Sequence, residues 1–331
     1  MTDPLRVAIV GLGWWSAVHA AALKKTTLLK LVTCYTRTRE KGNRFAMENG
    51  CEYDSTFESL LRREDVDAVI LTTPHSTHLN LAIRIAEAGK HLLIEKPLTN
   101  TVANCQRIID EFKSRDLVLS VCQDRRWTAT HRKMKELIDA GVLGHVVIAE
   151  ANFSLASGLN LTPASWRWYE AESPGGPLAY LGIHMIDTVR FIVGAKVEEV
   201  DGLLDKMMTR AEIYDTAICR LAFSNGVHAI ITSSFVVPRV SFINVYGSGA
   251  NLYNSEMAGL SFQEAGTVEA VPVPLEQLDP IQAEQEDFAK SVVWRRKPAV
   301  DGFEGMANVA VIEALIKSSN ERRRVKMSEV L

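Results

Sequence analysis

The alternation of apolar runs and helical patterns over residues 5–122 constrains the fold more than any other feature of this chain. Almost wholly apolar runs, such as Leu5–Val10 and residues 68–72, alternate with helical segments such as Arg39–Asn49. Strands that are apolar on both faces are typical of parallel sheets, and the return to a parallel neighbour needs a crossover, usually a helix. The pattern predicts an α/β fold with a doubly wound parallel sheet. The expected strands are 5–10, 28–36, 68–72, 91–94 and 118–122, and the expected helices are 17–25, 39–49, 57–63, 78–88 and 101–115.

The pattern changes near residue 125. A helix over 132–140 and a strand over 146–154 precede a Trp/Pro/Gly-rich stretch and a helix over 178–193. Runs at hairpin spacing follow, with the turn Ser224-Asn225-Gly226 between two of them. These expected strands are 197–204, 213–223, 227–236, 241–246 and 251–253, and helices over 281–293 and 303–317 complete the chain.

Length and pattern together predict two domains. A chain of 331 residues exceeds what one hydrophobic core usually serves. We expect a first domain over 1–124 and a second, α+β domain over 125–331 with a large open, mostly antiparallel sheet. The C-terminal helix could pack back on the first domain.

Charge and cysteine content exclude several classes of protein. The net charge of −3 gives no electrostatic reason to expect nucleic acid or an anionic membrane as a partner. Five scattered cysteines without a CxxC pair indicate reduced thiols. No apolar run approaches the ~20 residues that span a bilayer, and the first residues lack a secretory pattern. We expect a cytoplasmic protein that binds a small molecule.

Two glycines, Gly11 and Gly13, lie between the first strand and a helix. A dinucleotide pyrophosphate needs backbone approach without a Cβ and the free N–H groups of a helix N-terminus. Ser16 stands at the third glycine position of this fingerprint. The arrangement predicts a Rossmann-type site for NAD or NADP, with Trp14 and Trp15 beside the cofactor.

The end of the second expected strand indicates which nicotinamide is preferred. NAD-specific folds place a carboxylate here to hold the ribose hydroxyls, whereas an arginine suits a 2′-phosphate. The segment Tyr35-Thr36-Arg37-Thr38-Arg39 contains no acid and two arginines. Because a guanidinium grips phosphate through two parallel hydrogen bonds, Thr36 and Arg37 favour NADP over NAD.

Two loops follow neighbouring buried strands, at the edge where ligands bind in open α/β sheets. The first contains Thr73, Pro74 and His78, and the second is Glu95-Lys96-Pro97. His75 and His78 have no third ligand at plausible spacing, so no metal is expected. A lysine beside a nicotinamide can hydrogen-bond a substrate hydroxyl, and desolvation can lower its pKa from about 10.4 for proton relay. Lys96 is therefore a catalytic candidate, although a lone lysine is usually a surface charge.

Tyr180, His184 and Asp187 are spaced four and three residues apart on the helix expected over 178–193. This spacing places them on one face, opposite an apolar core face. A histidine is a natural general base for a hydroxyl proton, and a carboxylate one turn away could orient it. A buried structural histidine paired with a helix carboxylate is the alternative interpretation.

Together these motifs resemble the Gfo/Idh/MocA oxidoreductases (glucose-fructose oxidoreductase / inositol dehydrogenase-like), in the order of that family. The matching residues are Val7 to Gly13 with His19, Thr73-Pro74 with His78, Glu95-Lys96-Pro97, Arg125-Arg126, Trp166-Arg167, Gly175-Gly176, Gly182, His184 and Asp187. The resemblance implies an active site where two domains meet, and a hydride exchanged between nicotinamide and a secondary alcohol or ketone of a sugar, inositol or related cyclic polyol. It also implies a homodimer or homotetramer formed through the C-terminal sheet.

The resemblance also implies roles for individual residues. Lys96, on a cis Lys96–Pro97 peptide, and His184 would be catalytic, and Arg126 would be near the cofactor. Trp166 and Arg167 would approach both nicotinamide and substrate, with Glu95 on the cofactor side and Asp187 on the substrate side. Many members of the family have aspartate four residues before the histidine, where this chain has Tyr180. Tyr180 is thus a candidate for proton transfer or for an aromatic wall.

Two alternative functions stay open. The aromatic residues Trp166, Trp168 and Tyr180 would suit a cis- or trans-dihydrodiol dehydrogenase that oxidises a cyclohexadiene diol. A non-catalytic NADP-binding regulator is the other alternative, although a pure binder would need neither Lys96 nor His184.

Overall fold

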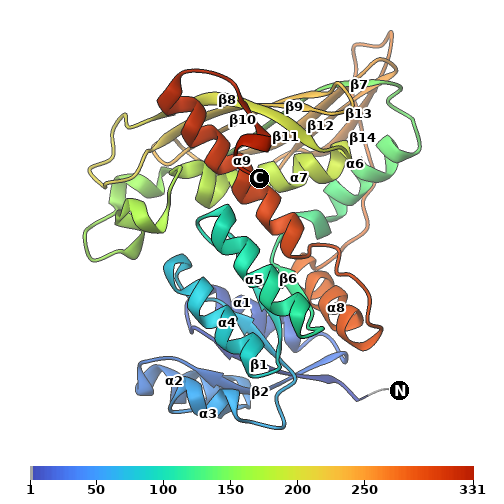
Figure 1. Cartoon of the computed structure of the whole chain (residues 1–331). Helices are drawn as coiled ribbons and strands as arrows, with labels where there is room; N and C mark the ends of the chain where they lie inside the picture. The colour runs from blue at the N-terminus through green and yellow to red at the C-terminus, as the bar shows by residue number, and fades with distance from the viewer. Residues whose placement is uncertain (1–2) are drawn as a thin grey trace. The chain divides into compact units, whose positions relative to one another are not determined.

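The computed structural model describes residues 3–331, which form two compact units (Figure 1). Unit 1 contains the residues up to Thr99, then Ala103–Trp127 and Asp279–Met306. Unit 2 contains Asn100–Val102, Thr128–Leu278 and Ala307–Leu331. The chain passes from unit 1 to unit 2 after Trp127, returns to unit 1 at Asp279, and enters unit 2 again at Ala307.

Unit 1 is built on a six-stranded sheet in the order β3-β2-β1-β4-β5-β6, with every neighbouring pair parallel. This is the doubly wound order in which ligands bind at the carboxyl ends of the strands. The strands are β1 (Leu5–Val10), β2 (Leu29–Tyr35), β3 (Glu52–Tyr53), β4 (Ala68–Leu71), β5 (His91–Ile94) and β6 (Leu119–Val121). The parallel sheet predicted from the alternation is confirmed, whereas the short β3 was not predicted.

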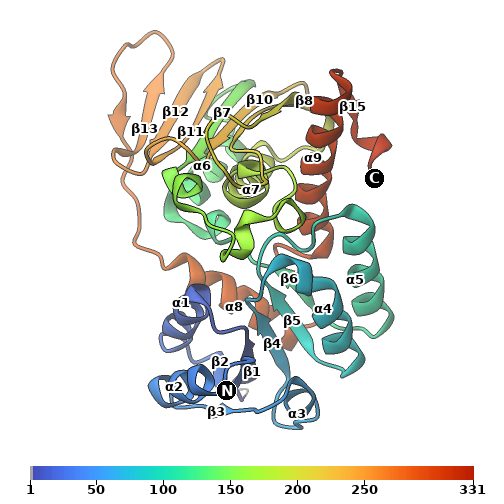
Figure 2. The same ribbon diagram turned by 90° about the vertical axis from the view of Figure 1, so that its left-hand side faces the viewer.

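The helices of unit 1 follow the predicted segments within a few residues. They are α1 (Trp14–Leu23), α2 (Arg39–Asn49), α3 (Phe57–Leu61), α4 (His78–Glu87), α5 (Val102–Ser114) and α8 (Pro280–Val293), with α9 (Gly302–Glu321) starting in this unit. Short 3₁₀ turns η1 (His75–Thr77) and η2 (Asp124–Trp127) follow β4 and β6. Figure 2 shows α4 and α5 along one side of the sheet, and α8 packs against α1 and η2.

The core of unit 1 explains why its strands are so apolar. All four residues of β4 are fully buried, as are Leu92, Leu93 and Ile94 of β5. Burying one such side chain contributes about 1.5–3 kcal/mol, so these two strands fix the centre of the sheet. The loops after β4 and β5 consequently leave a rigid edge.

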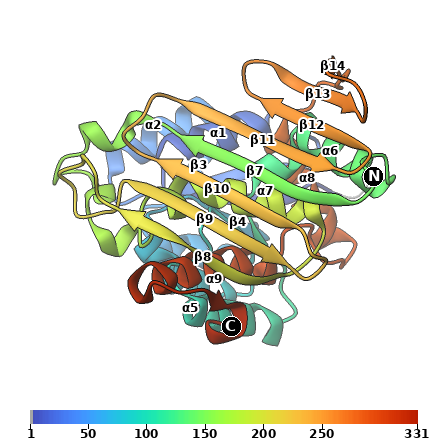
Figure 3. The same cartoon turned by 90° about the horizontal axis from the view of Figure 1, so that it is seen from above.

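Unit 2 contains a nine-stranded sheet in the order β14-β13-β12-β11-β7-β10-β9-β8-β15. Its strands are β7 (Val146–Ser154), β8 (Val197–Asp205), β9 (Thr216–Phe223), β10 (His228–Ser234), β11 (Val240–Gly247), β12 (Ala250–Ser255), β13 (Gly259–Glu264), β14 (Val271–Pro272) and β15 (Val325–Lys326). Figure 3 shows the central strands side by side. The predicted antiparallel sheet is confirmed, except that β7 and β10 pair in parallel and that β13, β14 and β15 were not predicted.

Helices α6 (Ala129–Asp139) and α7 (Ile183–Val193) lie along one face of this sheet (Figure 1). The Trp/Pro/Gly-rich stretch forms the turns η3 (Ala156–Asn160), η4 (Trp166–Trp168) and η5 (Glu170–Glu172), and η7 (Met327–Glu329) ends the chain. No helix among residues 3–331 is long and apolar enough to cross a membrane.

The prediction of a single α-helix over 178–193 is wrong for its first turn. Leu178–Gly182 forms a π-helical turn, η6, that leads into α7. A π turn closes its hydrogen bonds from i to i+5 and so rotates Tyr180 away from the position that α-helical spacing gives it relative to His184. The expected division into a polar and an apolar face is also wrong, because residues 181–189 are all buried.

Candidate functional site

The glycine loop has the geometry that a dinucleotide requires. Gly11 has φ +92°, and a Cβ there would come within 2.9 Å of the Thr72 backbone. At Gly13 a Cβ would meet no atom within 4 Å, so the loop is open on that side. Gly13 is also the N-cap of α1, and no side chain caps its N–H groups. These residues fit a pyrophosphate at the helix N-terminus.

The end of β2 presents arginine and no carboxylate. Arg37 and Arg39 are exposed, and Thr36 is half-buried with its carbonyl accepting a hydrogen bond from Tyr53. In the described part of the chain Arg37 has no ion-pair partner. Trp14, with 73% of its surface exposed, contacts Trp15 edge-on at 4.9 Å between ring centroids. The open surface around Arg37 fits a phosphate better than a neutral ribose.

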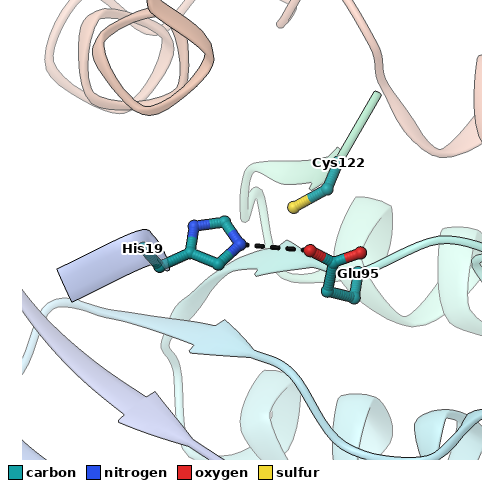
Figure 4. Close-up of side chains that lie close together, drawn as sticks. All are labelled: His19, Glu95 and Cys122. Carbon is teal, nitrogen blue, oxygen red and sulfur yellow. Dashed lines mark hydrogen bonds and ion pairs between the residues drawn. The ribbon is translucent and has the colours of Figure 1, made fainter. Parts of the chain in front are cut away.

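Lys96 lies in a buried loop at the carboxyl end of β5. Its side chain is only 7% exposed, and the Lys96–Pro97 peptide is cis, as predicted. Glu95 fixes the start of this loop, because its Oε2 accepts the Lys96 N–H at 3.2 Å while its Oε1 faces His19 Nε2 at 3.2 Å. Figure 4 shows the His19 ring and the Cys122 thiol on the same side of the Glu95 carboxylate.

His19, Glu95 and Cys122 also form a set of three metal-capable donors within 4.8 Å of one another. Gln285 Nε2 donates to the His19 carbonyl and also lies 3.1 Å from His19 Nδ1, at the same distance. Because an amide nitrogen only donates, His19 Nδ1 accepts, and the ring proton of His19 is on its Nε2, which faces Glu95. Burial raises the pKa of the Cys122 thiol well above its usual value. The hydrogen bonds of Glu95 to His19 and to the Lys96 N–H show that this cluster supports the start of the lysine loop.

Two residues predicted to bind the cofactor, His78 and Arg126, make hydrogen bonds within unit 1. His78 is fully buried, with Nδ1 3.0 Å from the Pro97 carbonyl and Nε2 3.0 Å from the Thr73 carbonyl. Its contacts link the Thr73-Pro74 loop to the lysine loop. Arg126 is also buried and donates to Glu304 at 2.6 Å and to the Ala299 carbonyl. These hydrogen bonds position both side chains within the fold, and their roles in cofactor binding stay predictions.

In unit 2 the predicted substrate residues form an aromatic cluster. The Arg167 guanidinium carbon lies 4.7 Å from the Trp166 ring and 4.6 Å from the Tyr180 ring. Tyr180 also contacts Phe235, at 5.9 Å between centroids. Arg167 Nε is buried without a hydrogen-bond partner among residues 3–331. The arrangement offers an aromatic wall with a cation held between two rings.

His184 and Asp187 are both buried on α7. His184 packs against Phe153 at 6.1 Å between ring centroids, and its backbone carbonyl accepts a hydrogen bond from Thr188. Asp187 accepts a hydrogen bond at 2.7 Å from Asn308, which accepts one at 2.6 Å from Arg190. Asp187 therefore anchors α7 to α9.

Sequence reasoning missed the residues that support these side chains. Gln285 and Asn308 lie more than 100 positions from their partners, and Asp124 and Glu284 carry no motif. A cavity at the amino-terminal ends of β5 and β6, lined by His91, Val118 and Phe303 among others, lies away from the predicted catalytic loops.

Comparison with known proteins identifies the family. Residues 5–123 match the model of an oxidoreductase family with an NAD-binding Rossmann fold, and residues 131–253 match the GFO/IDH/MocA C-terminal domain. The myo-inositol 2-dehydrogenase of Thermotoga maritima is 30% identical over 99% of this chain and 100% of its own length. The chain belongs to the GFO/IDH/MocA oxidoreductase family. The resemblance predicted from the motifs is thus confirmed.

Other relatives agree with this assignment. The NADP⁺-dependent D-xylose 1-dehydrogenase of Haloarcula marismortui is 27% identical over 98% of this chain and 94% of its own length. The crystal structure of a candidate NADPH-dependent oxidoreductase from Desulfitobacterium hafniense superposes with a TM-score of 0.96 at 34% identity, covering 100% of this chain and 99% of that one. The GFO/IDH/MocA protein described here is accordingly an oxidoreductase of the NAD(P)-dependent kind.

Proposed function

We propose that this oxidoreductase transfers a hydride between NADP and a secondary alcohol or ketone of a sugar, inositol or related cyclic polyol. The observation that carries the proposal is the buried Lys96 in a loop fastened by Glu95 and His78. A surface charge would need no such support. The names of the xylose and inositol dehydrogenases among its relatives support the substrate class.

The bound nicotinamide would supply the carbon that accepts or donates the hydride. Lys96 would donate a hydrogen bond to the substrate oxygen and polarise it, and His184 would take the hydroxyl proton as the hydride leaves. Gly11, Gly13, Arg37 and the Thr73-Pro74 loop would hold the cofactor, while Asp187 would keep α7 in place.

The lysine is tested by Lys96→Ala in a screen of inositols, aldoses and a cis-dihydrodiol. We expect turnover to fall at least about a thousandfold while the affinity for NADPH, measured by fluorescence titration, changes less than about threefold. Lys113→Ala is the matched control, because Lys113 lies on the surface helix α5. Near-normal turnover of Lys96→Ala would overturn the catalytic role. Activity on the dihydrodiol alone would favour the alternative substrate class.

The preference for NADP is carried by Arg37. Arg37→Gln should weaken NADPH binding at least about tenfold and leave NADH binding nearly unchanged, because a bidentate contact to the 2′-phosphate is lost. Arg44→Gln, on the exposed side of α2, is the control. Equal losses for both nucleotides would assign Arg37 to general cofactor binding instead.

Substrate selection is proposed to depend on Trp166, Arg167 and Tyr180. The apolar face of a sugar or polyol ring packs well on aromatic rings, and a phenol adds one donor. Tyr180→Phe should raise KM with little change in kcat if the ring forms a wall. A loss of kcat with a shifted pH profile would assign proton transfer to the Tyr180 hydroxyl.

We also propose a homodimer or homotetramer formed through the outer face of the unit 2 sheet. Leu203, Ile218 and Ile230 on neighbouring strands are each more than 40% exposed, and Leu203 and Ile218 pair directly across β8 and β9. Ile218→Glu should lower the mass measured by light scattering if this face is covered by a second copy. An unchanged oligomer would place the interface elsewhere.

The cytoplasmic location predicted from the cysteines stays a prediction.

A further inference from the structure

Asp124 lies beside Lys96 at the carboxyl edge of the unit 1 sheet. Strands β5 and β6 are parallel neighbours, with Ile94 opposite Val121. Lys96 follows β5 by two residues, and Asp124 follows β6 by three, as the first residue of η2. Adjacent parallel strands deliver their following loops to the same edge, so this lysine and this carboxylate emerge next to each other.

The charges around Asp124 agree with this placement. Burial raises the pKa of the Asp124 carboxyl and Glu95 raises it further, whereas Arg125 and Lys96 act in the opposite direction. The charge of Lys96 therefore acts on this carboxyl. The other nearby acids are Glu95, which is already engaged with His19, and Glu284 on α8.

Glu284 explains how three acids can coexist there. It is 2% exposed, and burial, followed by the charges of Asp124 and Glu95, raises its pKa well above the usual value. Its Oε1 accepts the Gln123 N–H, and its Oε2 has no hydrogen-bond partner within residues 3–331. The raised pKa favours the neutral form of Glu284, which lessens its repulsion of the Asp124 carboxylate.

We propose that Asp124 is the carboxylate partner of Lys96, a positioning residue that keeps the ammonium charged and in place while it polarises the substrate oxygen. This inference rests on the proposed function, because it assigns Lys96 to catalysis. In alcohol oxidation the hydride goes to the nicotinamide and the hydroxyl proton to His184, so Asp124 gains and loses no atom.

The decisive variant is Asp124→Asn in the holoenzyme, with Asp124→Glu as the conservative variant. We expect Asp124→Asn to lower kcat at least tenfold and to move the limb of the pH profile that reports Lys96 to lower pH, because a neighbouring negative charge favours the ammonium. Asp124→Glu should restore most of the activity and the position of that limb. Asp116→Asn, on the exposed surface of the same unit, should change neither.

A second measurement does not depend on turnover. Reductive ¹³C-methylation followed by NMR titration reports the ionisation of Lys96 directly, with Lys96→Arg assigning its resonance. Asp124→Asn should lower the titration midpoint of that resonance by at least half a pH unit. An unchanged midpoint together with an unchanged pH profile would overturn the inference, even if the variant were less stable. Wild-type protein that oxidises or reduces nothing in the substrate screen would overturn the proposed function instead, and the NMR result would still decide whether Asp124 and Lys96 are partners.

Discussion

The link between Asn308 and Asp187 offers a direct test of how unit 2 holds α7. Asn308 is fully buried on α9 and uses its amide twice, donating to Asp187 at 2.7 Å and accepting from Arg190 at 2.6 Å. Asn308→Ala removes both hydrogen bonds and leaves a small cavity. A hydrogen bond to a charged group contributes about 1.5–3 kcal/mol. Because Asp187 and Arg190 each keep another interaction, we expect a net loss of about 2–4 kcal/mol.

Hydrogen exchange measured by mass spectrometry localises this loss. At about 1.4 kcal/mol per tenfold change, the protection of amides in α7 should fall about 30- to 1,000-fold. The matched control is Asn251→Ala in β12, whose half-buried amide also bonds two side chains, those of Gln263 and Tyr253. We expect about 0–1 kcal/mol there, since water replaces the lost partners.

A second variant makes the test sharper. Asn308→Asp keeps the shape of the side chain but turns the donor that faces Asp187 into a second carboxyl, so it should destabilise α7 at neutral pH and recover as the pH falls and one carboxyl protonates. If Asn308→Ala matched the control within about 0.5 kcal/mol, or if Asn308→Asp were as stable as wild type at pH 7, the buried amide would not be what holds Asp187.

Three further outcomes follow from buried or strained positions. Gly11→Ala should lower the free energy of unfolding, measured by chemical denaturation, by about 1–3 kcal/mol more than Gly50→Ala, and it should weaken NADPH binding. Both positions have positive φ, but only at Gly11 would a Cβ lie against the Thr72 backbone. Equal losses for the two variants would contradict the steric argument. Glu284 has a raised folded pKa, so its contribution to stability is present below its unfolded pKa, near 4.3, and is lost as the pH rises through the folded value. The melting temperature of Glu284→Gln, relative to that of the wild type, should therefore rise as the pH increases above about 4.3. A difference in melting temperature that does not change with pH would refute this. Burial acts to raise the pKa of Asp215, but hydrogen bonds from the Thr209, Met208 and Met207 N–H groups lower this pKa on balance. Asp215→Asn should therefore lower the free energy of unfolding by about 1.5–3 kcal/mol at pH 7, and by progressively less as the pH falls through the folded pKa. A pH series of denaturation curves measures this difference.

Much of the candidate site could be predicted because its backbone follows local rules. Gly11 and Gly13 come directly after a buried strand, and Glu95-Lys96-Pro97 follows another, so the strand pattern alone sends both loops to one edge of a parallel sheet. Family motifs added the cis Lys96–Pro97 peptide, which the structure confirms. The roles of Lys96, His184 and Tyr180 in catalysis stay predictions.

Other features escaped prediction because they depend on long-range packing. The partners of His78 and Arg126 are examples, because they are backbone carbonyls and, for Arg126, the distant Glu304. The π turn at Tyr180 changes the face on which that side chain lies, and the alternation of apolar residues does not distinguish it from an α turn.

The sequence by itself therefore determined the alternating parallel sheet, the loops at its carboxyl edge and the family. These features depend on the period of apolar residues and on glycines and prolines, whose effects act within a few residues. The tertiary structure alone decided that Gln285 supports His19 from 266 positions away and that Asn308 holds Asp187. It also decided that the charge of Lys96 acts on Asp124 and the charge of Asp124 on Glu284. Buried polar groups must find partners wherever the folded chain provides them, and no local pattern records which distant residue that will be.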